Sequence, residues 1–454
     1  MREHLLKVGV SGIRGVVGEF LTPSLACSFA QAFGTYVGAG RVVVGRDTRS
    51  SGPMLQHAVT CGLLASGCEV IDVGVMPTPT IQIYIASIHA RGGIAITASH
   101  NPPEYNALKL FNAQGLFFNN YERSELLDLY HQSDFRQATN AEIRRVASDR
   151  DTPSRLHIER VLRHVNVEAI RKSRFRVALD SVNGAGSLMS CGFLEGTLGC
   201  ELHAISVNPE LPFPRIAEPR ADTLGDLSAL VVQTGSQIGF GQDPDGDRLA
   251  VVDETGHVLD NDDVLALAVD AVLRRLPGDV VVNLTTSSVI GDVAARYGRR
   301  VWRTPVGEAN VVETMQAARA SIGGEGSNGG IIFPAVHLCR DSYTGMAFLL
   351  DRMAQTGESI AKLAKSLPRY FRKFGTVAYA HGRLGSLMQA LEENFPDIPS
   401  DRSDGLKLIL PSGWIHVRAS NTEPLLRLAA EARSQEQVDE LYARVVHLLS
   451  NPAE

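Results

Sequence analysis

The chain has 454 residues, and its 50 acidic residues exceed its 44 basic residues, which gives a formal net charge of −6. This length predicts about three domains and allows two to four, and the 44% hydrophobic and 21% charged residues exclude a disordered chain. The charge excludes a nucleic-acid coat, and six cysteines without a Cys-x-x-Cys motif exclude a disulfide scaffold and a thiolate zinc site. We expect a cytoplasmic protein with no secretory signal and no membrane or nucleic-acid partner.

Short runs rich in Val and Ile alternate with segments of helical length through most of the chain. Such alternation is typical of α/β units with a largely parallel sheet. Strands are predicted at 41–45, 69–73 and 93–97, with a helix over 52–66, then at 175–180, 204–207 and 237–241, and again at 279–283, 300–303 and 321–323. The pattern predicts three successive α/β units, which could be a diverged internal repeat.

The last part of the chain has a different pattern. Four short strands are predicted at 374–379, 407–410, 414–417 and 425–428, with a helix between the first two and a final helix over 435–449. This order is typical of an α+β domain. Polar segments and Pro or Gly breakers separate the units. We therefore predict four domains, which span residues 1–150, 151–252, 253–367 and 368–454.

A serine loop, Thr97-Ala-Ser-His-Asn-Pro-Pro103, follows a predicted strand. Ligands collect at the ends of strands in α/β sheets. Ser99 beside His100 could be a nucleophile if a base activates it, and Lys109 could be that base if it is desolvated. The alternatives are a polar turn bonded to its own backbone and a solvated surface lysine.

A metal loop, Asp243-Pro-Asp-Gly-Asp-Arg248, lies between two predicted strands. Three carboxylates at alternate positions can converge on one hard cation, and without it they would repel one another. The loop is no EF-hand, because Arg248 stands in the place of the required glycine. It also resembles the nucleophile loop of haloacid-dehalogenase phosphatases, although Asp247 replaces their threonine. A solvated acidic turn is the remaining alternative.

Two further loops offer ligand-binding groups. A sugar loop, Gly323-Gly-Glu-Gly-Ser-Asn-Gly-Gly330, surrounds the acceptor Glu325 with glycines that let the backbone approach a ligand, but it is no P-loop. A phosphate loop, Arg418-Ala-Ser-Asn-Thr-Glu-Pro424, combines the planar fork of Arg418 with Ser420, Asn421 and Thr422, which suits a phosphate dianion. A flexible hairpin and an ordinary turn are the alternatives. The turn Gly45-Arg-Asp-Thr-Arg49 could be an internal ion pair or part of a basic rim.

These loops, in this order, resemble those of the α-D-phosphohexomutase superfamily. The resemblance runs from Val10-Ser-Gly-Ile-Arg-Gly15 to the phosphate loop, and the serine and metal loops are its most specific parts. It implies an α/β fold of four domains around a central cleft, with three mixed-sheet α/β units and a C-terminal α+β domain.

The resemblance also implies a mechanism. Phosphorylated Ser99 would give its phosphoryl group to a sugar monophosphate, and the resulting hexose 1,6-bisphosphate, which is also the activator, would turn around and return the other phosphate. Mg²⁺ would be held by Ser99, Asp243, Asp245 and Asp247. The other implied site residues are Arg14, His100, Lys109 and Arg248 for charge and proton movement, Glu325 and Ser327 for the sugar, and Arg418, Ser420, Asn421 and Thr422 for the second phosphate.

The sequence departs from the family pattern in the sugar loop. Gly329 stands where many members have a histidine that is a proposed proton carrier, and we expect His337, or His100 with Lys109, to replace it. The loop is closer to a variant found in members assigned as phosphoglucosamine mutases, so glucosamine phosphate is the expected substrate. The alternatives are a phosphomannomutase or phosphoglucomutase of broad specificity, a phosphatase with Asp243 as nucleophile, and an inactive sugar-phosphate sensor.

Overall fold

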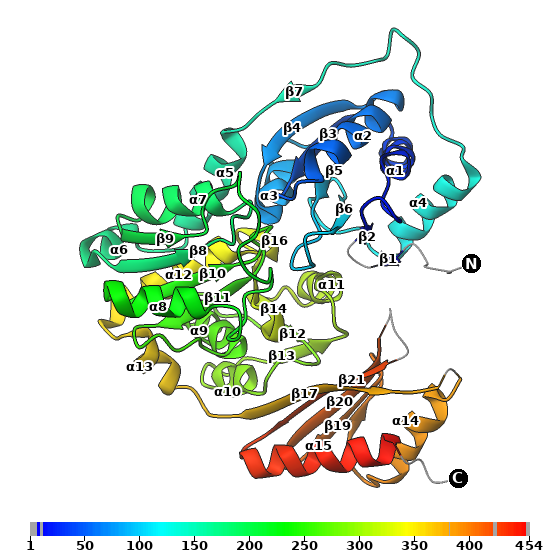
Figure 1. The fold of residues 1–454 in the computed structure, drawn as a ribbon. Helices are drawn as coiled ribbons and strands as arrows, with labels where there is room; N and C mark the ends of the chain where they lie inside the picture. The colour runs from blue at the N-terminus through cyan, green and yellow to red at the C-terminus, as the bar shows by residue number, and fades with distance from the viewer. Residues whose placement is uncertain (1–6, 10–11, 381, 421–424, 451–454) are drawn as a thin grey trace.

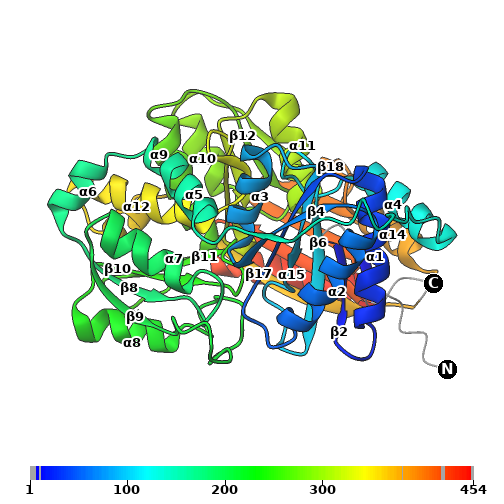
Figure 2. The ribbon, with the colours of Figure 1, turned by 90° about the horizontal axis from the view of Figure 1, so that it is seen from above.

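The computed structural model describes residues 7–9, 12–380, 382–420 and 425–450. Four sheets with their helices form four domains, which Figure 1 shows from blue at the top to red at the bottom. Viewed from above, the second and third domains lie beside the first, and the fourth passes beneath them (Figure 2). In the described part of the chain, no helix is both long and apolar enough to cross a membrane.

The first domain is built on a seven-stranded mixed sheet of order β1-β2-β6-β5-β3-β4-β7. Its elements are β1 (Lys7–Gly9), β2 (Gly12–Val16), α1 (Pro23–Val37), β3 (Arg41–Arg46), α2 (Gly52–Ala65), β4 (Glu69–Val75), α3 (Thr78–Ser87), β5 (Gly92–Ile96), β6 (Tyr105–Phe111), α4 (Asn120–Gln132) and β7 (Ala147–Ser148). The predicted parallel strands β3, β4 and β5 form its centre, and β6 joins antiparallel to β5 and β2. Helices α1, α2 and α4 pack on one face and α3 on the other.

The second domain has a four-stranded sheet of order β11-β10-β8-β9. Its elements are α5 (Thr152–Leu162), α6 (Val167–Ser173), β8 (Arg176–Asp180), α7 (Ser187–Cys191), a π-helical turn (Gly192–Thr197), β9 (Glu201–Ile205), α8 (Gly225–Thr234), β10 (Ile238–Gln242) and β11 (Leu249–Asp253). The strand expected at 204–207 begins three residues earlier and ends before Ser206, whose φ of +54° leaves the extended region.

The third domain has a five-stranded sheet of order β13-β12-β14-β15-β16. Its elements are α9 (Asn261–Leu273), β12 (Val280–Asn283), α10 (Val289–Ala295), β13 (Val301–Thr304), α11 (Glu308–Ala318), β14 (Ile322–Glu325), a 3₁₀ turn (Gly326–Asn328), β15 (Gly330–Phe333), β16 (His337–Arg340), α12 (Ser342–Thr356) and α13 (Ile360–Lys365). One apolar core contains residues of both the second and third domains, so these two domains pack as one body.

The fourth domain has an antiparallel sheet of order β17-β21-β20-β19-β18. Its elements are β17 (Phe371–Ala378), α14 (Leu384–Glu393), β18 (Ser400–Asp401), β19 (Leu406–Leu410), β20 (Gly413–Ala419), β21 (Leu425–Ala432) and α15 (Gln435–Ser450). Helices α14 and α15 contribute to an apolar core that this domain does not share with the other three. The fold is therefore the four-domain α/β and α+β arrangement that the sequence predicts.

A buried histidine joins the first three domains. His157 in α5 is fully buried, and its Nδ1 lies 2.8 Å from Thr80 Oγ1 in α3. Its Nε2 lies 3.0 Å from Asp341 Oδ2, at the N-terminus of α12. Because both ring nitrogens are bonded to groups of other domains, the imidazole fixes α3 relative to α12.

Polar bonds connect the fourth domain to the third. Lys407 Nζ donates to the Leu284 carbonyl oxygen at 2.5 Å, and the Ser288 amide donates to Glu431 at 2.9 Å. Arg372 forms ion pairs with Asp260 and Asp262. These bonds hold the sheet of the fourth domain against the third domain.

Lys407 makes the stability of this junction depend on pH. Burial, with the nearby guanidinium of Arg303, lowers the pKa of Lys407 to about 6. Between that value and the ordinary value of about 10.4, the unfolded chain holds a proton that the folded chain does not, so the free energy of unfolding rises with pH. Below the folded pKa both the folded and the unfolded chain hold the proton, and the loss of folding free energy caused by burying the charged lysine reaches its full value.

We therefore expect the melting temperature of Lys407→Met minus that of wild type to be several degrees higher at pH 6 than at pH 9, because only the wild-type protein is destabilised at the lower pH. Calorimetry across this range checks the prediction, and Lys373→Met, at an exposed ion pair of the same domain, is the control. A difference between the Lys407→Met and wild-type proteins that does not change with pH would contradict it.

Candidate active site

A cleft of about 1130 Å³ is lined by residues of all four domains. Each of the four predicted loops contributes to it, through Ser99, Arg248, Glu325 and Arg418. The resemblance implies a set of site residues. Those that line the cleft, among the described residues, are Arg14, Ser99, His100, Lys109, Arg248, Glu325, Ser327, Arg418 and Ser420. Asn421 and Thr422 lie outside the described residues.

The serine loop is held in a strained conformation at the end of β5. Ser99 has a φ of +50°, which is rare for a residue with a side chain. Its amide donates to Thr97 Oγ1 at 2.9 Å, and its hydroxyl donates to Asp243 Oδ2 at 2.7 Å. The loop therefore presents the Ser99 hydroxyl directly to the metal loop.

Arg49 clamps this loop from beneath. Its Nε donates to Asp47 Oδ2 at 3.0 Å, which confirms an ion pair in the turn after β3. Its two terminal nitrogens donate to the carbonyl oxygens of Ser99, Asn101, Pro102 and Tyr105 at 2.6 to 3.0 Å. One planar guanidinium thus fixes the path of the whole loop.

We expect Arg49→Lys to lower kcat by about 100-fold with little change in KM. Lysine keeps the positive charge but cannot make the several hydrogen bonds of the guanidinium to the loop carbonyl oxygens. A shift of about 1 Å at a reacting group can lower the rate by about 100-fold. Steady-state kinetics check the prediction, with Arg41→Lys at the exposed start of β3 as the control. An unchanged kcat would show that the clamp does not position Ser99.

The three aspartates of the metal loop converge as predicted. Asp243, Asp245 and Asp247 are buried, and one carboxylate oxygen of each lies within 4.8 Å of the others. Asp245 Oδ1 and Asp247 Oδ1 are buried and make no hydrogen bond. Burial and the two neighbouring carboxylates raise the pKa of Asp243 well above its usual range. Unpaired buried carboxylate oxygens fit a bound hard cation, so the triad could hold a metal ion.

Basic groups surround the triad. Lys109 Nζ lies 2.6 Å from Asp245 Oδ2 and 3.3 Å from Asp247 Oδ2. His100 Nδ1 lies 3.4 Å from Ser99 Oγ, and burial with nearby guanidiniums lowers the pKa of His100 to about 2. His100 is therefore a neutral imidazole at physiological pH, and positive charge at this end of the cleft comes from lysine and arginine.

The sugar loop places Glu325 at the end of β14. Its Oε1 accepts hydrogen bonds from Asn283 Nδ2 and the Gly307 amide, both at 2.9 Å. Ser327 Oγ lies 3.5 Å from Thr285 Oγ1. The loop is the turn of an antiparallel hairpin between β14 and β15, and its acceptor Glu325 and the hydroxyl residue Ser327 both line the cleft.

The phosphate loop brings two arginines together. Arg418 in β20 and Arg427 in β21 are direct cross-strand partners, and both line the cleft. Like charges directly opposite each other destabilise a sheet, so an anion between them would relieve the repulsion. The sequence did not identify Arg427 as a site residue, because it is nine residues from Arg418 and only the pairing of the two strands brings the arginines together.

Sequence reasoning also missed two buried charged residues in the cleft. Glu308 begins α11, and burial raises its pKa to about 7. Arg340 ends β16 and forms ion pairs with Asp247, Glu308 and Glu325. His337 Nε2 instead lies 3.2 Å from the Gly115 carbonyl oxygen, and this histidine is not among the residues that line the cleft.

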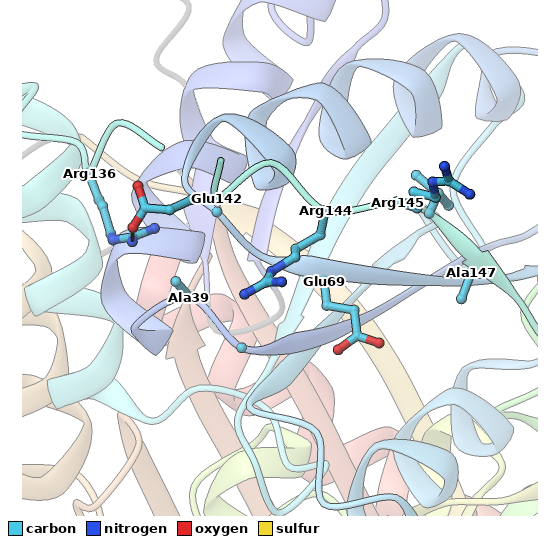
Figure 3. Close-up of a pocket in the computed structure, with 10 residues that line it drawn as sticks. Ala39, Glu69, Arg136, Glu142, Arg144, Arg145 and Ala147 are labelled. Atoms are coloured by element: carbon cyan, nitrogen blue, oxygen red, sulfur yellow. Dashed lines mark hydrogen bonds and ion pairs between the residues drawn. The ribbon is translucent and has the colours of Figure 1, made fainter. Parts of the chain in front are cut away.

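A second cavity, of about 660 Å³, lies at the opposite edge of the first sheet. It is lined by Ala39 and Gly67, which precede β3 and β4, and by the segment that leads to β7. Figure 3 shows Arg144 between Glu69 and the Arg136–Glu142 ion pair. The cavity shares no lining residue with the cleft, so it is separate from the chemistry at Ser99.

A serine hydroxyl bonded to one of three converging carboxylates, in a cleft rimmed by arginines, defines an enzyme that transfers phosphoryl groups. The chain also matches four family models, described as phosphoglucomutase/phosphomannomutase alpha/beta/alpha domains I, II and III and C-terminal domain, over residues 5–137, 155–256, 260–371 and 381–448. It belongs to the phosphoglucomutase/phosphomannomutase family, and it is a phosphohexomutase.

Relatives cover nearly the whole chain. A phosphoglucomutase/phosphomannomutase of Thermococcus kodakarensis is 38% identical over 97% of this chain and 98% of its own. A probable phosphoglucosamine mutase of Methanopyrus kandleri is 37% identical over 97% of each chain. The crystal structure of a family protein from Burkholderia thailandensis is 26% identical and has a TM-score of 0.84 over 98% of this chain and 97% of that one.

Proposed function

We propose that the protein interconverts glucosamine 6-phosphate and glucosamine 1-phosphate in the cytoplasm, through phosphorylated Ser99 and a 1,6-bisphosphate that also acts as activator. The observation that carries the transfer step is the 2.7 Å hydrogen bond from Ser99 Oγ to Asp243, because Ser99 lines the same cleft as Glu325 and Arg418. The resemblance of the sugar loop to the phosphoglucosamine-mutase variant, and the named relative from Methanopyrus kandleri, support glucosamine. The Thermococcus kodakarensis relative supports glucose or mannose phosphate as the alternative.

Mg²⁺ is the cation that best suits the triad, because it prefers oxygen ligands and binds through carboxylates together with phosphate. Asp243, Asp245, Asp247 and Ser99 would hold it. When bound, Mg²⁺ polarises phosphoryl oxygens and neutralises their charge.

The chain's own residues position the sugar phosphate and neutralise its charge. Arg14, which donates to Asn101 of the serine loop at 2.6 Å, and Arg248 line the same cleft as Ser99 and would stabilise charge on the transferring group. Arg418, Ser420, Asn421 and Thr422 would hold the other phosphate, and Arg427 adds a second fork. Glu325 would accept hydrogen bonds from the sugar hydroxyls, and Ser327 would donate one to them.

A base must take the proton of the sugar hydroxyl that attacks the phosphoryl group. Lys109 is the candidate that the sequence suggests, but its amine is ion-paired with Asp245 and Asp247, and although burial alone would lower it, these carboxylates hold its pKa above the ordinary value. Glu308 is a second, because it lines the same cleft and its carboxyl can hold or release a proton near neutral pH.

A ³¹P NMR time course tests the function. The enzyme is mixed with Mg²⁺, a trace of hexose 1,6-bisphosphate and, in separate tubes, the 6-phosphates of glucosamine, N-acetylglucosamine, glucose and mannose. We expect the fastest transfer to C1 with glucosamine and no release of inorganic phosphate. A faster reaction with glucose or mannose would reject the substrate, and accumulation of inorganic phosphate would reject the mutase mechanism in favour of hydrolysis.

A further inference from the structure

The guanidinium of Arg340 lies between the metal loop and the sugar loop. Strand β16 runs antiparallel to β15 and places Arg340 opposite Ile332, directly after the sugar loop. The Arg340 side chain is 10% exposed and lines the cleft. In the part of the chain that the structure describes, no other arginine forms ion pairs with residues of both loops.

Two glycines of the sugar loop make room for this arginine. A Cβ on Gly330 would lie 2.4 Å from Arg340 Cδ. A Cβ on Gly329, whose φ is +66°, would lie 2.6 Å from the carbonyl oxygen of Leu249. A side chain at either position would clash with its surroundings, so position 329 has no room for the histidine that many family members have there. The stem of Arg340 fills the adjacent space instead.

Each of the three guanidinium nitrogens is directed at a different carboxylate. Nη2 lies 2.7 Å from Asp247 Oδ2 in the metal loop, and Nη1 lies 3.5 Å from Glu325 Oε2 in the sugar loop. Nε and the backbone amide of Arg340 bond to the two oxygens of Glu308, at 2.9 and 3.2 Å. Because the guanidinium is planar and fixed at Nε, a movement that shortens its distance to Glu325 lengthens its distance to Asp247.

We propose that Arg340 couples the two loops, so that a cation at the three aspartates and a sugar phosphate at Glu325 each strengthen the binding of the other. The inference rests on the proposed function, because it takes a sugar phosphate as the ligand of Glu325. Arg340 acts here through Asp247 and Glu325, so it is a positioning residue.

The direction of the coupling follows from the distances and charges. Without a cation, the Asp247 carboxylate is neutralised by Arg340 and Lys109. A cation at the triad takes over part of this charge, which weakens the hold of Asp247 on Nη2. The guanidinium can then close the 3.5 Å distance to Glu325 and orient its carboxylate for the sugar hydroxyls. By reciprocity, the bound sugar phosphate raises the affinity for the cation by the same factor.

Binding of Mn²⁺ to the dephosphorylated enzyme tests the proposal without turnover. The free ion is measured by electron paramagnetic resonance, with and without saturating glucosamine 6-phosphate or glucose 6-phosphate. We expect the better-bound sugar phosphate to lower the Kd for Mn²⁺ about 10-fold in the wild-type enzyme, within the usual range of such couplings. In Arg340→Lys and Arg340→Met the sugar phosphate should change this Kd less than about twofold.

The two variants separate coupling from folding. Arg340→Lys keeps the buried positive charge and loses the fork, so it decides the question if Arg340→Met does not fold. Arg352→Lys, at a partly buried ion pair with Asp270 outside the cleft, should behave as wild type. No effect of sugar phosphate in the wild-type enzyme, or an equal effect in wild type and Arg340→Lys, would overturn the proposal. If Mn²⁺ binding were coupled through Arg340 but no sugar phosphate were isomerised in the NMR experiment, the proposed function would fail and the coupling would stand.

Discussion

Replacing Ser99 by alanine is expected to lower turnover by about 10⁴-fold or more, the order found when a catalytic nucleophile is removed. The hydroxyl is the only polar group of the serine side chain, and it donates to Asp243 Oδ2 at 2.7 Å. Alanine removes this oxygen and leaves the Arg49 clamp on the loop carbonyl oxygens in place. The variant should therefore still bind sugar phosphate while it no longer forms a phosphoenzyme.

Three measurements check this result. They are the steady-state rate, the mass of the protein after incubation with hexose 1,6-bisphosphate, and the KM for the sugar phosphate. Ser28→Ala, on the exposed side of α1, is the matched control and should show wild-type values. A Ser99→Ala enzyme with the wild-type rate would rule out a phosphoserine at this position.

The second large effect is expected for Asp245→Asn. This change keeps the shape of the side chain and removes one of three charges around the presumed cation position. Asp245 Oδ2 already accepts bonds from Lys109 and Thr78, both at 2.6 Å, while Oδ1 has no partner. Loss of a group that merely orients a metal ligand costs about 10- to 100-fold in affinity, so loss of a ligand should weaken Mn²⁺ binding by more than about 100-fold.

Mn²⁺ affinity and turnover should fall together in Asp245→Asn. Asp253→Asn is the matched control, because Asp253 is a buried aspartate at the other end of β11 whose Oδ1 accepts hydrogen bonds from the turn at Thr255. It can cost stability but should leave Mn²⁺ affinity unchanged. Normal Mn²⁺ affinity in Asp245→Asn would show that the triad is a structural acidic turn.

Local patterns in the sequence predicted the parallel strands and the order of the loops. Apolar runs such as 41–45 and 279–283 are buried on both faces, so their position follows from composition alone. The convergence of Asp243, Asp245 and Asp247 was predictable for a similar reason, because alternate positions of one short loop share a side.

Groups that depend on long-range pairing were not predictable. Strands β6, β15 and β16 join antiparallel, and no local period marks the direction in which a strand pairs. Arg340 and Arg427 reach the cleft, and Arg49 reaches the serine loop, only because distant strands lie side by side. The lysine predicted as a base has the expected place, but its ion pairs with Asp245 and Asp247 come from another domain and left no trace near position 109.

Because the fourth domain has its own apolar core, we expect it to separate from the third domain before the core shared by the second and third domains opens. The described bonds between this domain and the third are polar, so breaking them exposes little apolar surface and can be compensated by water. Amide protons at this junction should therefore exchange through small openings that denaturant hardly promotes, while those of β10 and β12 exchange only when the shared core opens. Arg418 and Arg427, the arginines proposed to bind phosphate, thus belong to the most readily released unit of the chain, and the three aspartates of the metal loop follow a strand of the core that opens last.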